Sequence, residues 1–291
     1  MRRFCLAAFA LAALVFVALA VASPAHADDW AKTYKFSGRP NLRVTTNDGH
    51  VDLYASSDGQ IDAHVTTTGW TIDRSGNDRD VKITESQSGN EITLDVHVPT
   101  FHFSFGWNNR SVRIELRVPR EADFDVETGD GSVTSQAFHG QLRISTGDGN
   151  IDATGLKGDL RLHSGDGHII ASDLDGSLHA DSGDGRLEIR GRFDALNLES
   201  GDGSVTAEAA SGSKISSDWS LRSGDGSITL RLPDGLNADL DAHTGDGHID
   251  LDFPVTVSGS ISGTTIRGKI GAGGPPLLVR TGDGSIHIGK M

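Results

Sequence analysis

The chain has 291 residues and a formal net charge of −14, and its 37 glycines are about twice the usual share of ~7 %. Hydrophobic residues make up 36 %, which is too much for a disordered chain, and the 8 prolines without a Gly-X-Y period exclude collagen. The acidic excess disfavours partners such as nucleic acid and anionic lipid headgroups. A chain of this length can bury one elongated core or two compact ones.

Residues 1–27 are predicted to be a secretory signal peptide. Met1-Arg2-Arg3 is a basic start, Leu6 to Ala22 is an apolar stretch, and Ala25-His26-Ala27 is an Ala-x-Ala cleavage pattern. An uncleaved membrane anchor is the alternative interpretation. We expect export to the periplasm, the cell surface or the medium. Cleavage removes Cys5, the single cysteine, so the mature chain has no disulfide, and we expect no membrane span in it.

A repeated tetrapeptide, Ser/Thr-Gly-Asp-Gly, dominates the second half of the chain. It occurs eight times, and successive copies lie 18, 18, 18, 18, 23, 21 and 37 residues apart. The last gap is about two periods, which predicts a decayed copy around Gly259 to Gly263. The copies begin at Thr128, Thr146, Ser164, Ser182, Ser200, Ser223, Thr244 and Thr281.

Runs of alternating apolar and polar residues flank each copy. Leu160-x-Leu162-x-Ser164 precedes one motif, and Ile169-x-Ala171 follows it. This period of two predicts two short strands per repeat, each with one buried face. A strand pair of this size buries its apolar face only by stacking on identical pairs. The sequence therefore predicts an all-β fold, a parallel and right-handed β-solenoid of about 18 residues per coil.

The tetrapeptide itself has a structural interpretation. Its Ser or Thr falls in the inward register, where stacked hydroxyls can bond to the backbone of the neighbouring turn. We expect its two glycines to adopt positive φ at a tight corner, and its aspartate to bond to its own turn backbone. The repeated aspartates thus need no catalytic role.

The segment before the regular repeats has a looser pattern. Asn47-Asp48-Gly49 and Ser57-Asp58-Gly59 look like degenerate copies, and three strand-like runs follow at Val81–Thr84, Glu91–Val98 and Ser111–Pro119. A solenoid needs a cover over its open end. The sequence therefore predicts a signal peptide over 1–27, a β-rich N-terminal lead-in and cap over 28–120, and regular solenoid repeats over 121–291.

These residues carry a family resemblance. A signal peptide, a β-rich lead-in ending at Val118-Pro119, the run Asp123 to Gly131 and the further Gly-Asp-Gly coils resemble the bacterial putative-adhesin family, a domain of unknown function. The resemblance extends from about Asn41 to Ile288. It implies a secreted or envelope β-solenoid used for surface interaction, and it implies no catalytic residue.

Ca²⁺ binding is the alternative to a purely structural role of the repeated aspartates. Stacked corners would place the aspartate carboxylates in one ladder at steps of ~4.8 Å, and a bound cation would relieve their repulsion. Ca²⁺ prefers six to eight oxygen ligands, however, and one carboxylate per turn supplies few of them. We expect no metal or other cofactor, and keep as weak Ca²⁺ candidates Asp130, Asp148, Asp166, Asp184 and Asp202.

One aromatic segment stands apart from the repeats. Phe101, Phe103, Phe105 and Trp107 lie within seven residues. If exposed, they would form an interaction surface for a glycan, a protein or a membrane surface. If buried, the three phenylalanines at period two are one strand face over the cap. Both interpretations stay open at the level of sequence.

Two functions from different classes compete. The first is a non-enzymatic exported β-solenoid that binds an unidentified surface or cell-wall ligand, as an adhesin or a structural module. The second is a carbohydrate-active β-helix enzyme of the polysaccharide lyase or hydrolase kind, which needs a cleft with convergent carboxylates. The uniform, short connections favour the first function.

Overall fold

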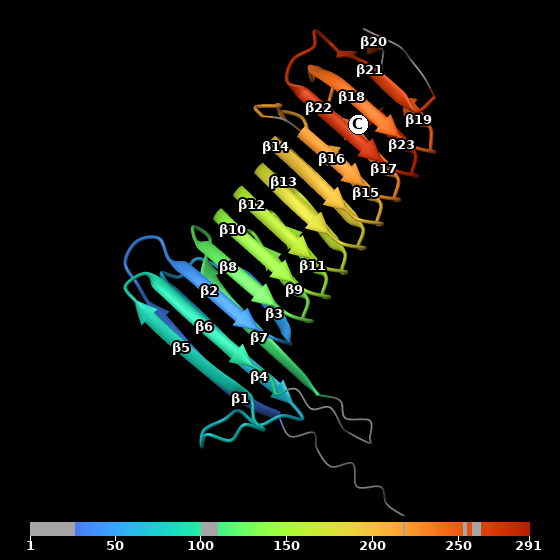
Figure 1. Cartoon of the computed structure of the whole chain (residues 1–291). Coiled ribbons are helices and arrows are strands. Elements are labelled where there is room, and N and C mark those ends of the chain that lie inside the picture. The colour runs from blue at the N-terminus through green and yellow to red at the C-terminus, as the bar shows by residue number, and fades with distance from the viewer. Residues whose placement is uncertain (1–26, 100–109, 218, 253–254, 258–262) are drawn as a thin grey trace, which may run out of the picture.

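The protein is described by a computed structural model, which covers residues 27–99, 110–217, 219–252, 255–257 and 263–291. These residues form an all-β structure of 23 strands in one continuous, mostly parallel sheet (Figure 1). The part of the chain that the structure describes contains no helix long and apolar enough to cross a membrane.

The strands β1 to β12 are Ala27–Lys35, Asn41–Thr46, His50–Ser56, Gln60–Thr68, Lys82–Ser88, Glu91–His97, Ser111–Pro119, Asp123–Thr128, Val133–Gln136, His139–Thr146, Ile151–Thr154 and Lys157–Ser164. The strands β13 to β23 are Ile169–Ser182, Leu187–Ser200, Val205–Ala209, Trp219–Ser223, Ile228–Leu232, Ala238–Thr244, Ile249–Leu251, Val255–Val257, Thr265–Ile270, Pro276–Thr281 and Ile286–Lys290. The strand-like runs expected between residues 81 and 119 thus correspond to β5, β6 and β7.

The strands are arranged in two ladders joined at their corners. Ladder 1 holds the strands that lead into each Gly-Asp-Gly corner, and ladder 2 holds the strands that leave it. Both β13 and β14 run through one ladder and bend into the other, which makes the sheet continuous. Neighbours in ladder 1 are β5-β6-β2-β8-β10-β12-β13-β14-β16-β22-β18-β21-β20, and in ladder 2 they are β1-β4-β7-β3-β9-β11-β13-β14-β15-β17-β23-β19.

Register follows the sequence repeat in the middle of the stack. In ladder 1, Leu142 pairs with Leu160 and Leu160 with Leu178, each 18 residues further on. These side chains are at most 3 % exposed, so equivalent residues form aliphatic columns between the two ladders. Each such leucine contributes roughly 1.5–3 kcal/mol through burial.

The order of strands in space departs from their order in sequence at both ends. Near the N-terminus, β2 lies between β6 and β8 and is parallel to both (Figure 1). In the same way, β3 lies between β7 and β9 and is parallel to both. The degenerate corner at Asn47-Asp48-Gly49 therefore belongs to the parallel stack. Antiparallel strands lie beyond it, with β5 on β6, β4 on β7 and β1 on β4.

The C-terminal end corrects the expectation of a decayed coil. Residues 258–262 lie outside the described part. The strand β21 pairs antiparallel with β18, and β20 pairs antiparallel with β21. The last motif, at Thr281, is not on the last coil, because β22 and β23 lie between the β16/β17 and β18/β19 rungs. The described strands of the long gap, β20 and β21, border ladder 1 as antiparallel neighbours.

In seven of the eight motifs the hydroxyl bonds to the neighbouring corner as expected, and Thr128 Oγ1 accepts only from Gly131 N of its own corner. Ser182 Oγ donates to the Gly167 carbonyl of the preceding rung at 2.9 Å and accepts from Gly185 N of its own corner at 3.1 Å. The same bond to the neighbouring corner is made by Thr146, Ser164, Ser200, Ser223, Thr244 and Thr281. These buried hydroxyls satisfy backbone groups where the chain turns.

The reason expected for the motif glycines is wrong. None of the sixteen in the eight motifs has a positive φ; in the repeats the left-handed conformation occurs at the opposite corner, at Gly158 and Gly176. The motif glycines are needed because successive corners touch. A Cβ on Gly147 would lie 2.8 Å from the Gly129 oxygen, and one on Gly167 would overlap the Gly149 carbonyl. Glycine permits backbone of one rung to rest on backbone of the next.

Replacing a motif glycine should therefore destabilise the stack. We expect Gly167→Ala to lower the free energy of unfolding by about 2–3 kcal/mol, because the added methyl group forces the corners apart. Gly59→Ala is the matched control, since its Cβ would meet no atom within 4 Å. Urea denaturation measures both. Equal stability of Gly167→Ala and the control would contradict the contact between corners.

The corner hydroxyl gives a second test. Ser182→Ala should lower the free energy of unfolding by about 1–3 kcal/mol, because the Gly167 carbonyl and the Gly185 amide lose their partner. Ser182→Thr should keep most of the stability, since threonine occupies the equivalent position at Thr146 and Thr281. Thermal melting compares both with Ser204→Ala, since the Ser204 side chain makes no hydrogen bond within the described residues. A full loss in Ser182→Thr would contradict the assigned role.

Candidate functional site

The Gly-Asp-Gly corners place the repeated aspartates along one edge of the stack, at the arrowhead ends of ladder 1 (Figure 1). All five candidate residues, Asp130, Asp148, Asp166, Asp184 and Asp202, are exposed. Within the described residues their carboxylates make no hydrogen bond or ion pair, so the expected bond from each aspartate to its own turn backbone is wrong. We call this row the aspartate edge.

The aspartate edge does not gather ligands around one point. Among the described residues, no group of three or more His, Cys, Asp or Glu side chains is placed to hold a metal ion. Each corner contributes one carboxylate, and its backbone carbonyls are used between rungs, as in the bond from Gly147 N to Gly129 O at 2.7 Å. Few oxygens are therefore left for a cation that prefers six or more.

The opposite edge, where ladder 2 returns to ladder 1, carries charges of both signs. Arg192 bonds to Asp194 at 2.7 Å and also to Asp175, while Glu121 accepts from His139 at 2.8 Å. The Arg192 hydrogen bond holds the pKa of Asp194 below its ordinary value. An open depression of about 680 Å³ lies here, but its charged side chains are largely paired with one another.

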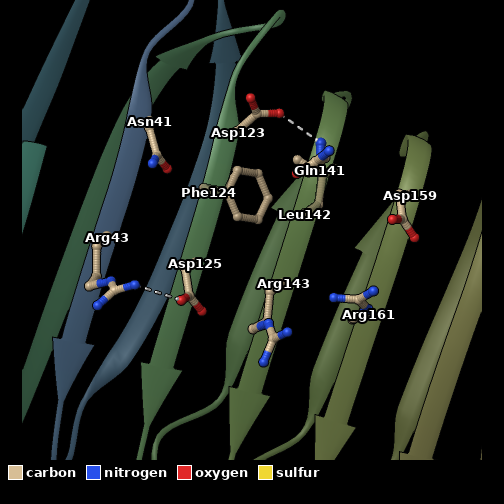
Figure 2. A pocket seen from close by; sticks show the side chains of 10 residues that line it. All are labelled: Asn41, Arg43, Asp123, Phe124, Asp125, Gln141, Leu142, Arg143, Asp159 and Arg161. Carbon is tan, nitrogen blue, oxygen red and sulfur yellow. Dashed lines mark hydrogen bonds and ion pairs between the residues drawn. The ribbon is translucent and has the colours of Figure 1, made fainter. Parts of the chain in front are cut away.

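Ladder 1 carries two shallow depressions on its outer face. One of about 280 Å³ is shown in Figure 2, and one of about 420 Å³ adjoins it. Both are lined by Arg143 of β10 and Arg161 of β12, which are register partners on neighbouring strands. We call this surface the arginine face. Its other lining residues are Asn41, Arg43, Asp123, Phe124, Asp125, Gln141, Leu142, Ile144, Ser145, Asp159, Leu162, His163, His179 and Asp181.

Charges on the arginine face are paired at its two ends. Arg43 Nη2 lies 3.4 Å from Asp125 Oδ2, and Asp181 contacts both His163 and His179, the latter at 3.4 Å. Figure 2 shows Arg143 and Arg161 side by side on neighbouring strands. Within the described residues neither side chain makes an ion pair or a hydrogen bond. These two arginines were not among the residues predicted from sequence. Their spacing of 18 residues, one repeat period, becomes a signal only once the register of the strands is known.

The aromatic segment with Phe101, Phe103, Phe105 and Trp107 lies outside the described residues. Beside it, Arg110 stacks over the ring of Trp70 with its guanidinium carbon 4.5 Å from the ring centroid. Whether the four aromatic side chains are exposed or buried stays a prediction from sequence.

The fold and its surfaces define a class, an all-β protein built of stacked, mostly parallel strand pairs with polar outer faces. The family model described as "Toastrack DUF4097" matches residues 40–289, and the chain belongs to this family. The family resemblance predicted from the Gly-Asp-Gly repeats is thereby confirmed.

Two solved structures are similar to the chain. A "putative cell adhesion protein" from Clostridium sporogenes is 12 % identical, with 91 % of this chain and 100 % of that chain covered and a TM-score of 0.32. A "putative adhesin" from Bacteroides fragilis is 14 % identical, with 91 % and 97 % covered and a TM-score of 0.42. The comparison with curated proteins finds no match.

Metal removal tests the Ca²⁺ alternative. We expect the same melting midpoint in EDTA and in millimolar Ca²⁺, because the aspartate edge offers few oxygens at any one point. A variant with Asp148, Asp166 and Asp184 changed to Asn is the control. A midpoint that rises with Ca²⁺ in the parent chain but not in this variant would establish a cation site on the edge.

Proposed function

We propose that the chain is a non-enzymatic, exported module of the bacterial envelope that binds a surface or cell-wall ligand. It acts as an adhesin or as a structural element, in the periplasm, at the cell surface or after secretion. In this proposal the two ladders wind as a right-handed β-solenoid of about 18 residues per coil, which offers long, repetitive faces for contact.

One observation carries this proposal, namely the shape of the described surface. The depressions on ladder 1, of about 280 and 420 Å³, are open, and most of the residues that line them are polar residues of successive strands. A polysaccharide lyase or hydrolase needs a cleft in which two carboxylates, or a base and a metal, converge on one bond. The aspartate edge instead spreads its carboxylates one per rung.

Binding to surfaces along a repetitive face also fits the composition. Uncharged and charged polar residues alternate with buried ones along every ladder, so the faces stay soluble while offering hydrogen-bonding groups at regular steps. The predicted signal peptide supports a location outside the cytoplasm. The enzyme remains the second candidate, because polysaccharide-degrading enzymes also occur on parallel β-helices.

The two candidates differ in one assay. The chain without residues 1–27 is incubated with bacterial envelope fractions and with purified polysaccharides, and both co-sedimentation and product release are measured. We expect binding without product. Phe103→Ala with Trp107→Ala tests the aromatic segment in the same assay, and Tyr54→Ala, on the outer face of ladder 2, is the control.

Release of reducing ends or unsaturated products in proportion to the concentration of the chain would favour the second candidate, a polysaccharide-degrading enzyme. Absence of binding to every fraction would contradict the interaction module.

A further inference from the structure

Arg143 and Arg161 place two positive charges side by side on the outer face of ladder 1. Both side chains are exposed, they occupy the same register position on adjacent parallel strands, and neither has a carboxylate within 4.0 Å in the described structure. Like charges directly opposite each other on neighbouring strands destabilise a sheet. The protein has a formal net charge of −14, so carboxylates to neutralise the pair are abundant elsewhere.

The chain itself shows how such a charge arrangement is neutralised. On ladder 2, Glu208 lies between Arg190 at 3.1 Å and Arg231 at 3.7 Å, on the two flanking rungs. On ladder 1, Asp241 accepts ion pairs from arginines on either side, at 3.4 and 3.5 Å. In both places one carboxylate bridges two arginines of the stack. Arg143 has Asp125 as its register partner on β8, but Asp125 forms its ion pair with Arg43 on the other side, at 3.4 Å. No carboxylate of the described chain bridges Arg143 and Arg161.

The surroundings of the pair suit a ligand with hydroxyl groups as well as an acid group. Gln141, Ser145 and His163 lie in the same two depressions and can donate or accept hydrogen bonds. Asp125 and Asp159 also line the surface. These two carboxylates accept hydrogen bonds from hydroxyls but repel a ligand with dense negative charge, such as a sulfated or phosphorylated polymer.

We propose that Arg143 and Arg161 form a binding site for the carboxylate groups of an acidic polysaccharide, a chain with a single carboxylate on each sugar. Each guanidinium offers a planar, bidentate donor set for one carboxylate. The neighbouring polar groups of the arginine face hold the sugar hydroxyls. The inference rests on the proposed function and names its ligand class.

The test uses oligomers of polygalacturonate as the probe, because each sugar carries one carboxylate. Binding to the chain without residues 1–27 is measured by isothermal titration calorimetry at low salt. We expect the double variant Arg143→Gln, Arg161→Gln to weaken binding by at least about tenfold, because both charge-assisted hydrogen-bond sets are lost. Raising the NaCl concentration should also weaken binding of the parent chain.

A matched control separates the site from overall charge. Arg79→Gln with Arg117→Gln removes two exposed arginines that also lack an ion pair in the described structure, so the change in net charge is the same. We expect this control to bind polygalacturonate as the parent chain does. The Arg143/Arg161 variant should melt at or above the midpoint of the parent chain, because it loses no ion pair of the described structure and is relieved of the like-charge contact. The control should melt as the parent does.

Three results would overturn the inference. They are absence of polygalacturonate binding by the parent chain, equal binding by the Arg143/Arg161 variant, and tighter binding of heparin than of polygalacturonate. Other results test the proposed function and not the arginine site. Binding of envelope fractions by the Arg143/Arg161 variant would leave the proposed function standing. Cleavage of polygalacturonate by the parent chain would contradict the non-enzymatic function, while the two arginines could still bind the substrate.

Discussion

The regular repeats depend on the contact between one Gly-Asp-Gly corner and the next. The backbone of Gly147 donates to the Gly129 carbonyl at 2.7 Å, and no side chain could fit between them. In seven of the eight motifs the buried hydroxyl also bonds to the neighbouring corner. Because corners stack directly, the strands on both sides keep a common register, and the aliphatic residues fall into continuous columns.

The same register decides the chemistry of the surface. When equivalent positions stack, a residue type that recurs in sequence becomes a row in space. The repeated aspartates thus form an edge of unpaired carboxylates, while the opposite edge, with less regular residues, pairs Arg192 with Asp175 and Asp194. Arg143 and Arg161 become neighbours for the same reason. A face of this kind can meet a polymeric ligand at several successive steps.

Much of this arrangement could be predicted from local pattern. Alternation predicted the strands, and the inward Ser or Thr predicted the bond that Ser182 makes to Gly167. The role of the motif glycines was predicted wrongly, because a glycine demanded by its own φ and one demanded by a neighbouring rung look alike in sequence. The distinction depends on how closely two segments 18 residues apart approach each other.

The sequence by itself determined the β class, the strand pairs, the period and the family, because each depends on residues close together in the chain. Only the tertiary structure decided which rungs are neighbours. It placed β2 and β3 between β6/β7 and β8/β9, and β22 and β23 inside the C-terminal end. Because the strand pairs of different repeats have similar hydrogen-bonding edges, the repeat period alone does not determine their order in space. Their order is settled by pairing across the whole stack, with antiparallel strands left to border its ends.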